Sequence, residues 1–185
     1  MTKKAVLVCL FSLLICVTVN ARNREVSPRE LYYKVSSAMM LLMEKGEQGL
    51  SVISDAKKGN PFIWKDTYIF VYNCEKHILV SHPNKKLIGN TKIWDLRDPK
   101  GKRIMFSLCE VARKHRNGGW IEYYWPKKQT KNTKTTATTL GSKSVARKIS
   151  FCIQVPGTPY QVAGGIYNDS VSTKWLNTRV RIWLQ

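Results

Sequence analysis

The chain has 185 residues, of which 43% are hydrophobic and 23% charged, and its formal net charge at pH 7 is +19. This length provides for one domain with a hydrophobic core, and no segment after the first 21 residues is apolar for long enough to cross a bilayer. The positive charge would attract polyanions, but it is spread along the chain and argues as much for solubility as for a dedicated nucleic-acid site.

The first 21 residues predict a signal peptide. Lys3 and Lys4 form its basic start, residues 5–19 are largely apolar, and Val19-Asn20-Ala21 places small residues where a signal peptidase cleaves. We expect a mature chain that begins at Arg22, has a net charge of +17 without those two lysines, and is periplasmic or secreted. An uncleaved membrane anchor is the alternative, which the short apolar run disfavours.

The next segment predicts a long helix that packs on a sheet. Ser27 is a suitable N-cap, Pro28 suits the first helical position, and Gly46 ends the helix. The apolar residues recur at helical spacing, at Leu31, Val35, Ala38, Met39, Leu42 and Met43. Residues 47–56 predict a second helical segment whose inward side chains are Leu50, Val52 and Ile53.

The hydrophobic period then changes to that of strands. Residues 67–72 and 77–81 are rich in β-branched and aromatic side chains and predict a hairpin that turns at 73–76. Loop residues follow at 82–84 and 89–90, and a turn at 98–101 precedes a helix from 102 to about 115. His82 directly follows a strand, so we expect it at the end of that strand, where it either faces a ligand or orders the loop.

Three cysteines remain in the mature chain, namely Cys74, Cys109 and Cys152. They cannot all pair within one molecule, so an oxidising compartment allows one disulfide and a spare thiol, or no disulfide. The sequence does not choose among the three pairings. Cys74 and His77 have metal-ligand spacing, but similar residues are missing nearby, and a turn with a solvated histidine is the favoured interpretation.

The segments 118–126, 148–151 and 155–167 predict consecutive antiparallel strands with many aromatic side chains. Side chains alternate along a strand, so Ile121, Tyr123 and Trp125 share one face, while Trp120, Glu122 and Tyr124 share the other. Aromatic groups with an OH or NH suit a cavity wall as well as a core. The intervening stretch 127–148 has seven Lys or Arg and no acid, which predicts a mobile hairpin loop.

Signatures of catalysis are missing from the sequence, including the serine-hydrolase elbow, the zinc-protease motif, the P-loop and the dinucleotide fingerprint. We therefore predict a binding protein without a cofactor or metal, rather than an enzyme.

The long helix is followed, in order, by EKGEQGL at 44–50, YIFVY at 68–72, VSHP at 80–83, LIGN at 87–90, DLRDPKG at 95–101, GWIEYYWPK at 119–127, KIS at 148–150 and VPGT at 155–158. This order resembles the single Cache domain family, in its type 2 branch, over residues 27–169. The resemblance implies an α+β fold, a PAS-like antiparallel sheet with the long N-terminal helix packed on one face and a small-molecule pocket on the other.

Members of that family are extracytoplasmic sensing domains of chemoreceptors and histidine kinases, and many recognise small organic acids. By motif, the resemblance implies a ligand site formed by Tyr68, Phe70, His82, Trp120, Tyr123, Trp125 and Lys148. We expect Lys148, which opens the strand after the basic loop, to hold a ligand carboxylate; its alternative role is that of one more solvated lysine.

The sequence departs from the family pattern in three places. The hairpin turn at 73–76 lacks the usual Asp-x-x-Gly, the loop at 127–147 is longer and more basic, and a membrane span or signalling domain does not follow Tyr167. We thus expect a signal peptide at 1–21, a free-standing Cache domain at 22–170 and a C-terminal tail at 171–185. Its partners would be an organic acid and a membrane receptor, kinase or transporter.

The rival function is a basic secreted protein that binds a polyanion, such as nucleic acid, lipid head groups or an envelope polymer. The contacts would come from the basic loop, through Lys127, Lys128, Lys131 and Lys134.

Overall fold

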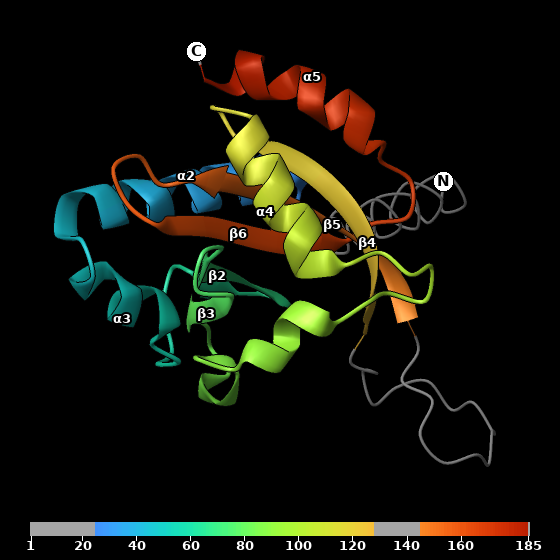
Figure 1. The fold of residues 1–185 in the computed structure, drawn as a ribbon. Helices are drawn as coiled ribbons and strands as arrows, with labels where there is room; N and C mark the ends of the chain where they lie inside the picture. The colour runs from blue at the N-terminus through green and yellow to red at the C-terminus, as the bar shows by residue number, and fades with distance from the viewer. Residues whose placement is uncertain (1–24, 128–144, 185) are drawn as a thin grey trace, which may run out of the picture.

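A computed structural model describes residues 25–127 and 145–184; the predicted signal peptide and Lys128, Lys131 and Lys134 lie outside these residues. The described residues form an antiparallel sheet of six strands with helices on both faces, as Figure 1 shows. The strand order is β1-β2-β6-β5-β4, and β3 pairs with the outer side of β2. The strands are β1 (Ile63–Trp64), β2 (Thr67–Asn73), β3 (Ile78–Ser81), β4 (Gly119–Pro126), β5 (Val145–Gln154) and β6 (Tyr160–Tyr167). This arrangement confirms the predicted α+β fold.

The predicted long helix is α2 (Pro28–Lys45), and its limits follow from its caps. The Ser27 side chain accepts a hydrogen bond from the Glu30 backbone N–H at 3.1 Å, and Gly46 ends the helix at a positive φ of 56°. We expected Met43 on the packed face, but it is exposed. Successive residues of an α-helix are about 100° apart around its axis, so Met43 points away from the face on which its neighbour Leu42 is buried.

The short helix α3 (Gln48–Ser54) confirms the second predicted helical segment. Ile53 is fully buried and Leu50 is half-buried, as expected. The expectation for Val52 was wrong, because this side chain is 43% exposed. A helix of two turns that rests on the sheet through one narrow face leaves the residue beside Ile53 in solvent.

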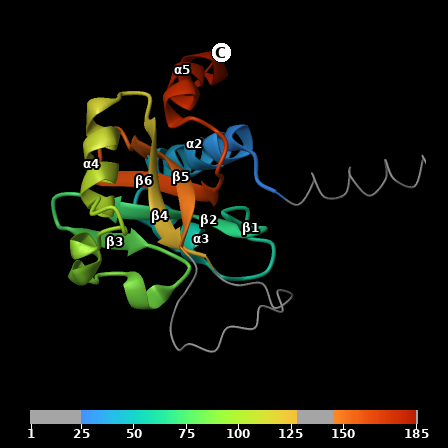
Figure 2. The same ribbon diagram turned by 90° about the vertical axis from the view of Figure 1, so that its right-hand side faces the viewer.

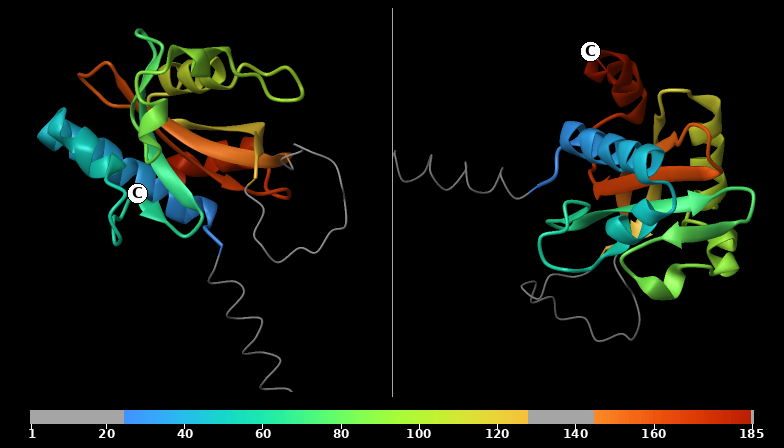
Figure 3. Two further views of the ribbon diagram at one scale, coloured as in Figure 1. Left: turned by 90° about the horizontal axis from the view of Figure 1, so that it is seen from below. Right: turned by 90° about the vertical axis from the view of Figure 1, so that its left-hand side faces the viewer.

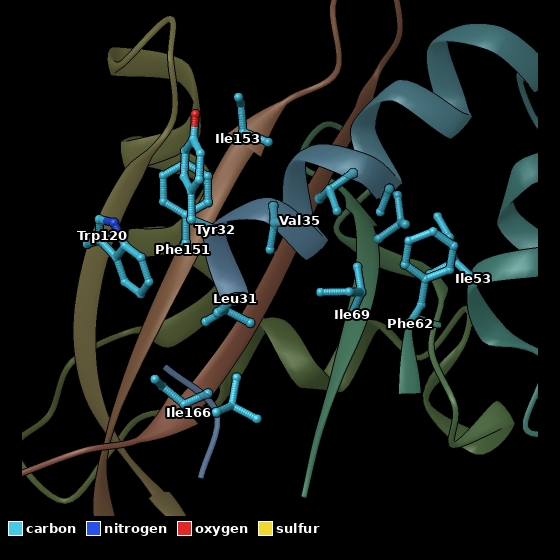
Figure 4. Close-up of a cluster of buried hydrophobic side chains, with 14 of the residues drawn as sticks. Leu31, Tyr32, Val35, Ile53, Phe62, Ile69, Trp120, Phe151, Ile153 and Ile166 are labelled. Carbon is cyan, nitrogen blue, oxygen red and sulfur yellow. The ribbon is translucent and has the colours of Figure 1, made fainter. Parts of the chain in front are cut away.

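The main core lies between α2 and the sheet, where Figure 4 shows its aromatic and aliphatic side chains. The helix can approach β6 closely because residue 164 is a glycine. A Cβ atom there would lie 2.8 Å from Cδ1 of both Leu31 and Ile69, which is closer than packed atoms tolerate. The helix side chains at this interface are Leu31, Tyr32, Val35, Ala38 and Leu42.

A second layer covers the opposite face of the sheet, as the view from below in Figure 3 shows. It consists of η1 (Lys85–Leu87), η2 (Thr91–Asp95) and α4 (Ile104–Lys114). Helix α4 confirms the predicted helix within two residues at each end. A disulfide between Cys74 and Cys109 ties the β2–β3 turn to α4, and Cys152 is a buried free thiol. The exposed His77 stacks on Trp94, with ring centroids 5.4 Å apart.

The predicted C-terminal tail contains a helix, α5 (Thr173–Trp183), that the sequence analysis missed. Leu176 and Val180 bury its inner face in the main core, and the Asn177 side chain bonds both backbone groups of Trp120. Figure 2 shows α5 above α2, and the bonds to Trp120 place it against the start of β4. Within the described part of the chain, no helix combines the length and apolarity that a membrane crossing requires.

Strand β5 begins earlier than predicted, at Val145, which pairs with Pro126 of β4. Arg147, which we expected in the basic loop, is therefore a strand residue, and Lys148, which we expected to open the strand, lies inside it. Arg147 forms an ion pair with Glu122 on the neighbouring strand, and this cross-strand pair favours the longer ladder.

Candidate functional site

A small cavity lies between the sheet and the second layer, on the face opposite α2. The centre of a water-sized sphere can move through about 40 Å³ of this cavity. The strands and their ends contribute Tyr68, Phe70, Leu79, His82, Tyr123, Trp125 and Lys148 to its wall. The second layer contributes only apolar side chains, namely Leu87, Ile93, Leu96, Ile104, Met105 and Leu108.

The structure brings six of the seven predicted site residues together in this wall. Trp120 is the exception: it lies in the main core, 5.3 Å from the Phe151 ring and 6.4 Å from the Trp183 ring. Its expected place in the pocket was wrong, because it is an odd number of positions from Tyr123 and Trp125 and therefore points to the other face.

Strand alternation and register explain how the six residues meet. Tyr68 and Phe70 are two positions apart on β2, as Tyr123 and Trp125 are on β4. Lys148 on β5 is the register partner of Tyr123. The pairing of adjacent strands thus sets one charged side chain among four aromatic ones on a single face of the sheet.

Lys148 is buried, with 5% of its surface exposed. Its Nζ lies 5.2 Å from the ring centroid of Tyr68 and 5.5 Å from that of Tyr167. Among the described residues, no carboxylate comes within ion-pair distance of this ammonium group. Burial lowers the pKa of Lys148 to about 8, and the negative charge of Asp66 opposes that change.

Gly165 makes room for the lysine side chain on β6. A Cβ atom at this position would lie 2.6 Å from Cε of Lys148 and 2.2 Å from Oγ of Ser150. The lysine stem therefore crosses β6 at the one place where that strand has no side chain on the pocket face.

His82 is buried at the end of β3, and both roles considered for it are compatible with its position. Its Nδ1 accepts a hydrogen bond from the Asn84 backbone N–H at 2.9 Å, which orders the loop. Burial lowers the pKa of His82 to about 4, and the charge of Lys148 adds to the effect. The ring is therefore neutral at pH 7, and because Nδ1 accepts, Nε2 has the proton and can donate it to a hydrogen bond.

The remaining polar groups of the wall are also neutral. The Tyr123 hydroxyl lies 3.0 Å from Oγ of Ser150, and burial raises the pKa of Tyr123. Burial likewise raises the pKa of Tyr68. The cavity thus combines one cation, neutral hydrogen-bond donors and an apolar opposite wall, which is an arrangement for holding a small anion.

The apolar wall and Gly165 are site features that sequence reasoning missed. The spacing of Ile104, Met105 and Leu108 indicates one face of an amphipathic helix, but this pattern does not tell a cavity wall from an ordinary core. Residues 25–127 and 145–184 contain no group of three or more His, Cys, Asp or Glu that could hold a metal ion.

Comparisons with known proteins give a family and a fold. A family model described as a Cache domain matches residues 60–172. One similar solved structure is the periplasmic sensor domain of a chemotaxis protein, at 23% identity and a TM-score of 0.50, covering 76% of this chain and 90% of that one. Another is a Cache chemosensory domain studied for carboxylic acid recognition, at 18% identity and a TM-score of 0.51, covering 76% and 92%.

A methyl-accepting chemotaxis protein from Vibrio parahaemolyticus is similar at 18% identity and a TM-score of 0.55, covering 84% of this chain and 94% of that one. At these identities the likeness concerns the fold. No curated protein matches the chain by sequence.

Proposed function

The chain belongs to the Cache domain family, and from that membership and the pocket we propose that it is an extracytoplasmic sensor domain for a small monocarboxylate. The observation on which the proposal rests is the single buried ammonium group of Lys148, which has no described carboxylate partner. An unpaired buried charge is costly, and a ligand carboxylate would compensate it with charge-assisted hydrogen bonds.

The charges of the wall support one carboxylate and no second charged group. Lys148 is the only charged side chain among the described lining residues, so a dicarboxylate would leave one anion unpaired. An amino acid would need an acid to receive its ammonium group, and the lining contains none. The apolar side chains from α4 and the η-helices suit a hydrocarbon tail.

The size of the cavity supports a short tail. By the same measure of volume, one water molecule needs about 10–15 Å³. The cavity therefore has room for about three chemical groups, each about as large as a water molecule. Acetate and propionate are of this order. The donors Nε2–H of His82 and the hydroxyl groups of Tyr68 and Tyr123 would complete the carboxylate's hydrogen bonds.

The disulfide between Cys74 and Cys109 supports export to an oxidising compartment, as the predicted signal peptide does. Family membership supports signalling through a membrane receptor, kinase or transporter that recognises the ligand-bound domain. Carboxylic acid recognition by a structurally similar Cache chemosensory domain supports the ligand class.

Thermal-shift and calorimetric titrations of the chain from Arg22 test the proposal. Propionate at a hundred times its Kd should add about 2.7 kcal/mol to the free energy of unfolding. Propionamide, which has the same shape as propionate but no charge, should add much less. Succinate and glycine should also add much less. Equal stabilisation by propionate and propionamide would contradict the proposal.

Two variants complete the test. Lys148→Met removes the buried charge at similar volume and should abolish the propionate response. Lys92→Met removes one exposed charge on η2, outside the cavity wall, and should keep the response.

A further inference from the structure

The outer face of α5 combines exposed apolar side chains with basic ones. Trp175 is 50% exposed and Ile182 is 51% exposed, although both belong to a helix whose inner face is fully buried at Leu176. Trp175 and Ile182 are seven residues apart, so they lie on one stripe along the helix. Leu184, which follows the helix, is also exposed.

Cations flank this stripe on both sides. Lys174 and Arg181 are also seven residues apart and form a row next to it, and Arg179 lies on its other side with its guanidinium 4.8 Å from the Trp175 ring centroid. The helix contains no acidic residue. None of these three cations forms an ion pair with a described acid.

The basic surface continues from α5 onto the end of α4. An open groove of about 630 Å³ lies beside Arg181 and is also lined by Lys114, His115 and Arg116, with Asn177 and Thr178 as neutral polar groups. The lining contains no acid; Glu110 lies one turn before Lys114 on α4 but outside the groove. The groove is thus a concave cationic surface continuous with the outer face of α5.

We propose that the outer face of α5 and this groove dock onto an anionic lipid surface. A helix that lies in a membrane interface typically has large apolar side chains on one stripe and lysine or arginine on both sides of it. The tryptophan and isoleucine of α5, with its flanking cations, have this arrangement. The indole and the aliphatic side chains enter the boundary between head groups and acyl chains, and the cations contact lipid phosphates. No described element covers this face, as Figures 1 and 2 show.

This surface is separate from the proposed ligand pocket. The groove and the pocket share no lining residue, and α5 packs on the main core rather than on the second layer. Lipid docking would hold the domain at a membrane surface, where its proposed signalling partner is located.

Vesicle co-sedimentation of the chain from Arg22 is the test, since that chain includes every described element. The chain should bind vesicles of phosphatidylcholine with one third phosphatidylglycerol, and bind pure phosphatidylcholine much less. Trp175→Ser with Ile182→Ser should weaken the binding, and so should Lys174→Gln with Arg181→Gln, on the order of fivefold for each charge removed. These side chains are exposed, so the variants are expected to keep the fold.

Two matched controls separate this site from diffuse attraction by a basic protein. Lys85→Gln with Lys86→Gln removes the same charge from exposed positions on η1, and Met40→Ser removes an exposed apolar side chain from α2. Both should bind like the unmodified chain. Losses in the controls equal to those in the α5 variants would overturn the proposal, as would equal binding to both kinds of vesicle or no binding to either.

Discussion

Replacing Lys148 with methionine should make the protein more stable and at the same time unable to bind its ligand. Methionine fills a similar volume without a charge, so the perturbation is largely electrostatic. In the folded protein the pKa of Lys148 is lowered from 10.5 to about 8. This difference of about 2.5 units corresponds to about 3 kcal/mol, by which the buried ammonium reduces the free energy of unfolding at pH 7.

The pH dependence follows from the same difference. Between pH 8 and 10.5 the unfolded chain keeps the Lys148 proton while the folded chain has lost it, so stability from this group rises with pH across that window. Above pH 10.5 both states are neutral and the cost is gone. The advantage of Lys148→Met should therefore be about 3 kcal/mol at pH 7 and should shrink toward zero near pH 10.5.

Urea denaturation of both proteins at pH 7 and pH 10 gives the difference in unfolding free energy between the variant and the unmodified chain at each pH. Comparing the two pH values cancels the titration of all other groups, because both proteins share them. Calorimetry measures propionate binding in parallel. Affinity should fall about tenfold per pH unit above pH 8, because only the ammonium form of Lys148 binds the carboxylate. Binding should also take up a growing fraction of a proton as the pH rises through 8. A Lys148→Met variant less stable than the unmodified chain at pH 7 would refute the electrostatic reasoning.

Three further predictions concern the glycine pair, the histidine and the disulfide. Gly165→Ala should weaken propionate binding in calorimetry by displacing Lys148, whereas Gly164→Ala, on the opposite face, should lower the melting temperature but keep the affinity of the folded protein. The pKa of His82 is lowered from 6.5 to about 4 in the folded state, so its contribution to the free energy of unfolding should decline by up to about 3 kcal/mol as the pH falls from 6.5 to 4. In denaturant titrations, His82→Gln should lack this part of the acid sensitivity. Replacing both disulfide cysteines with serine should cost about 2–4 kcal/mol of unfolding free energy, because the bond closes a loop of 35 residues; an unchanged denaturation midpoint would contradict this.

Local periodicity was sufficient to predict most of the fold. The Ser27 cap, the Gly46 stop and the alternation in β4 each depend on a few neighbouring residues, and each was predicted correctly. Helix α5 was missed although Ser172 caps it and Leu176 and Val180 have helical spacing, because these signals are short and lie in a stretch read as a tail.

The site was predictable only where alternation decides the face. It places Tyr123 and Trp125 together and, applied strictly, removes Trp120 from the pocket. Tertiary packing supplies what no local pattern contains. The disulfide partner of Cys74 and the wall from α4 depend on contacts between distant segments, and the burial of Lys148 depends on where β5 begins.

The two adjacent glycines of β6 link the proposed ligand charge to the long helix. Gly164 faces α2, where Leu31 occupies the space that a Cβ atom would need, and Gly165 faces the pocket, where Lys148 occupies it. Only the β6 backbone separates these two side chains. If a bound carboxylate moves Lys148, the contact of Lys148 with β6 at Gly165 would change, and a movement of that backbone would shift the surface on which Leu31 packs. Close packing has little free volume to absorb such a shift, so α2 is the element best placed to respond to the ligand.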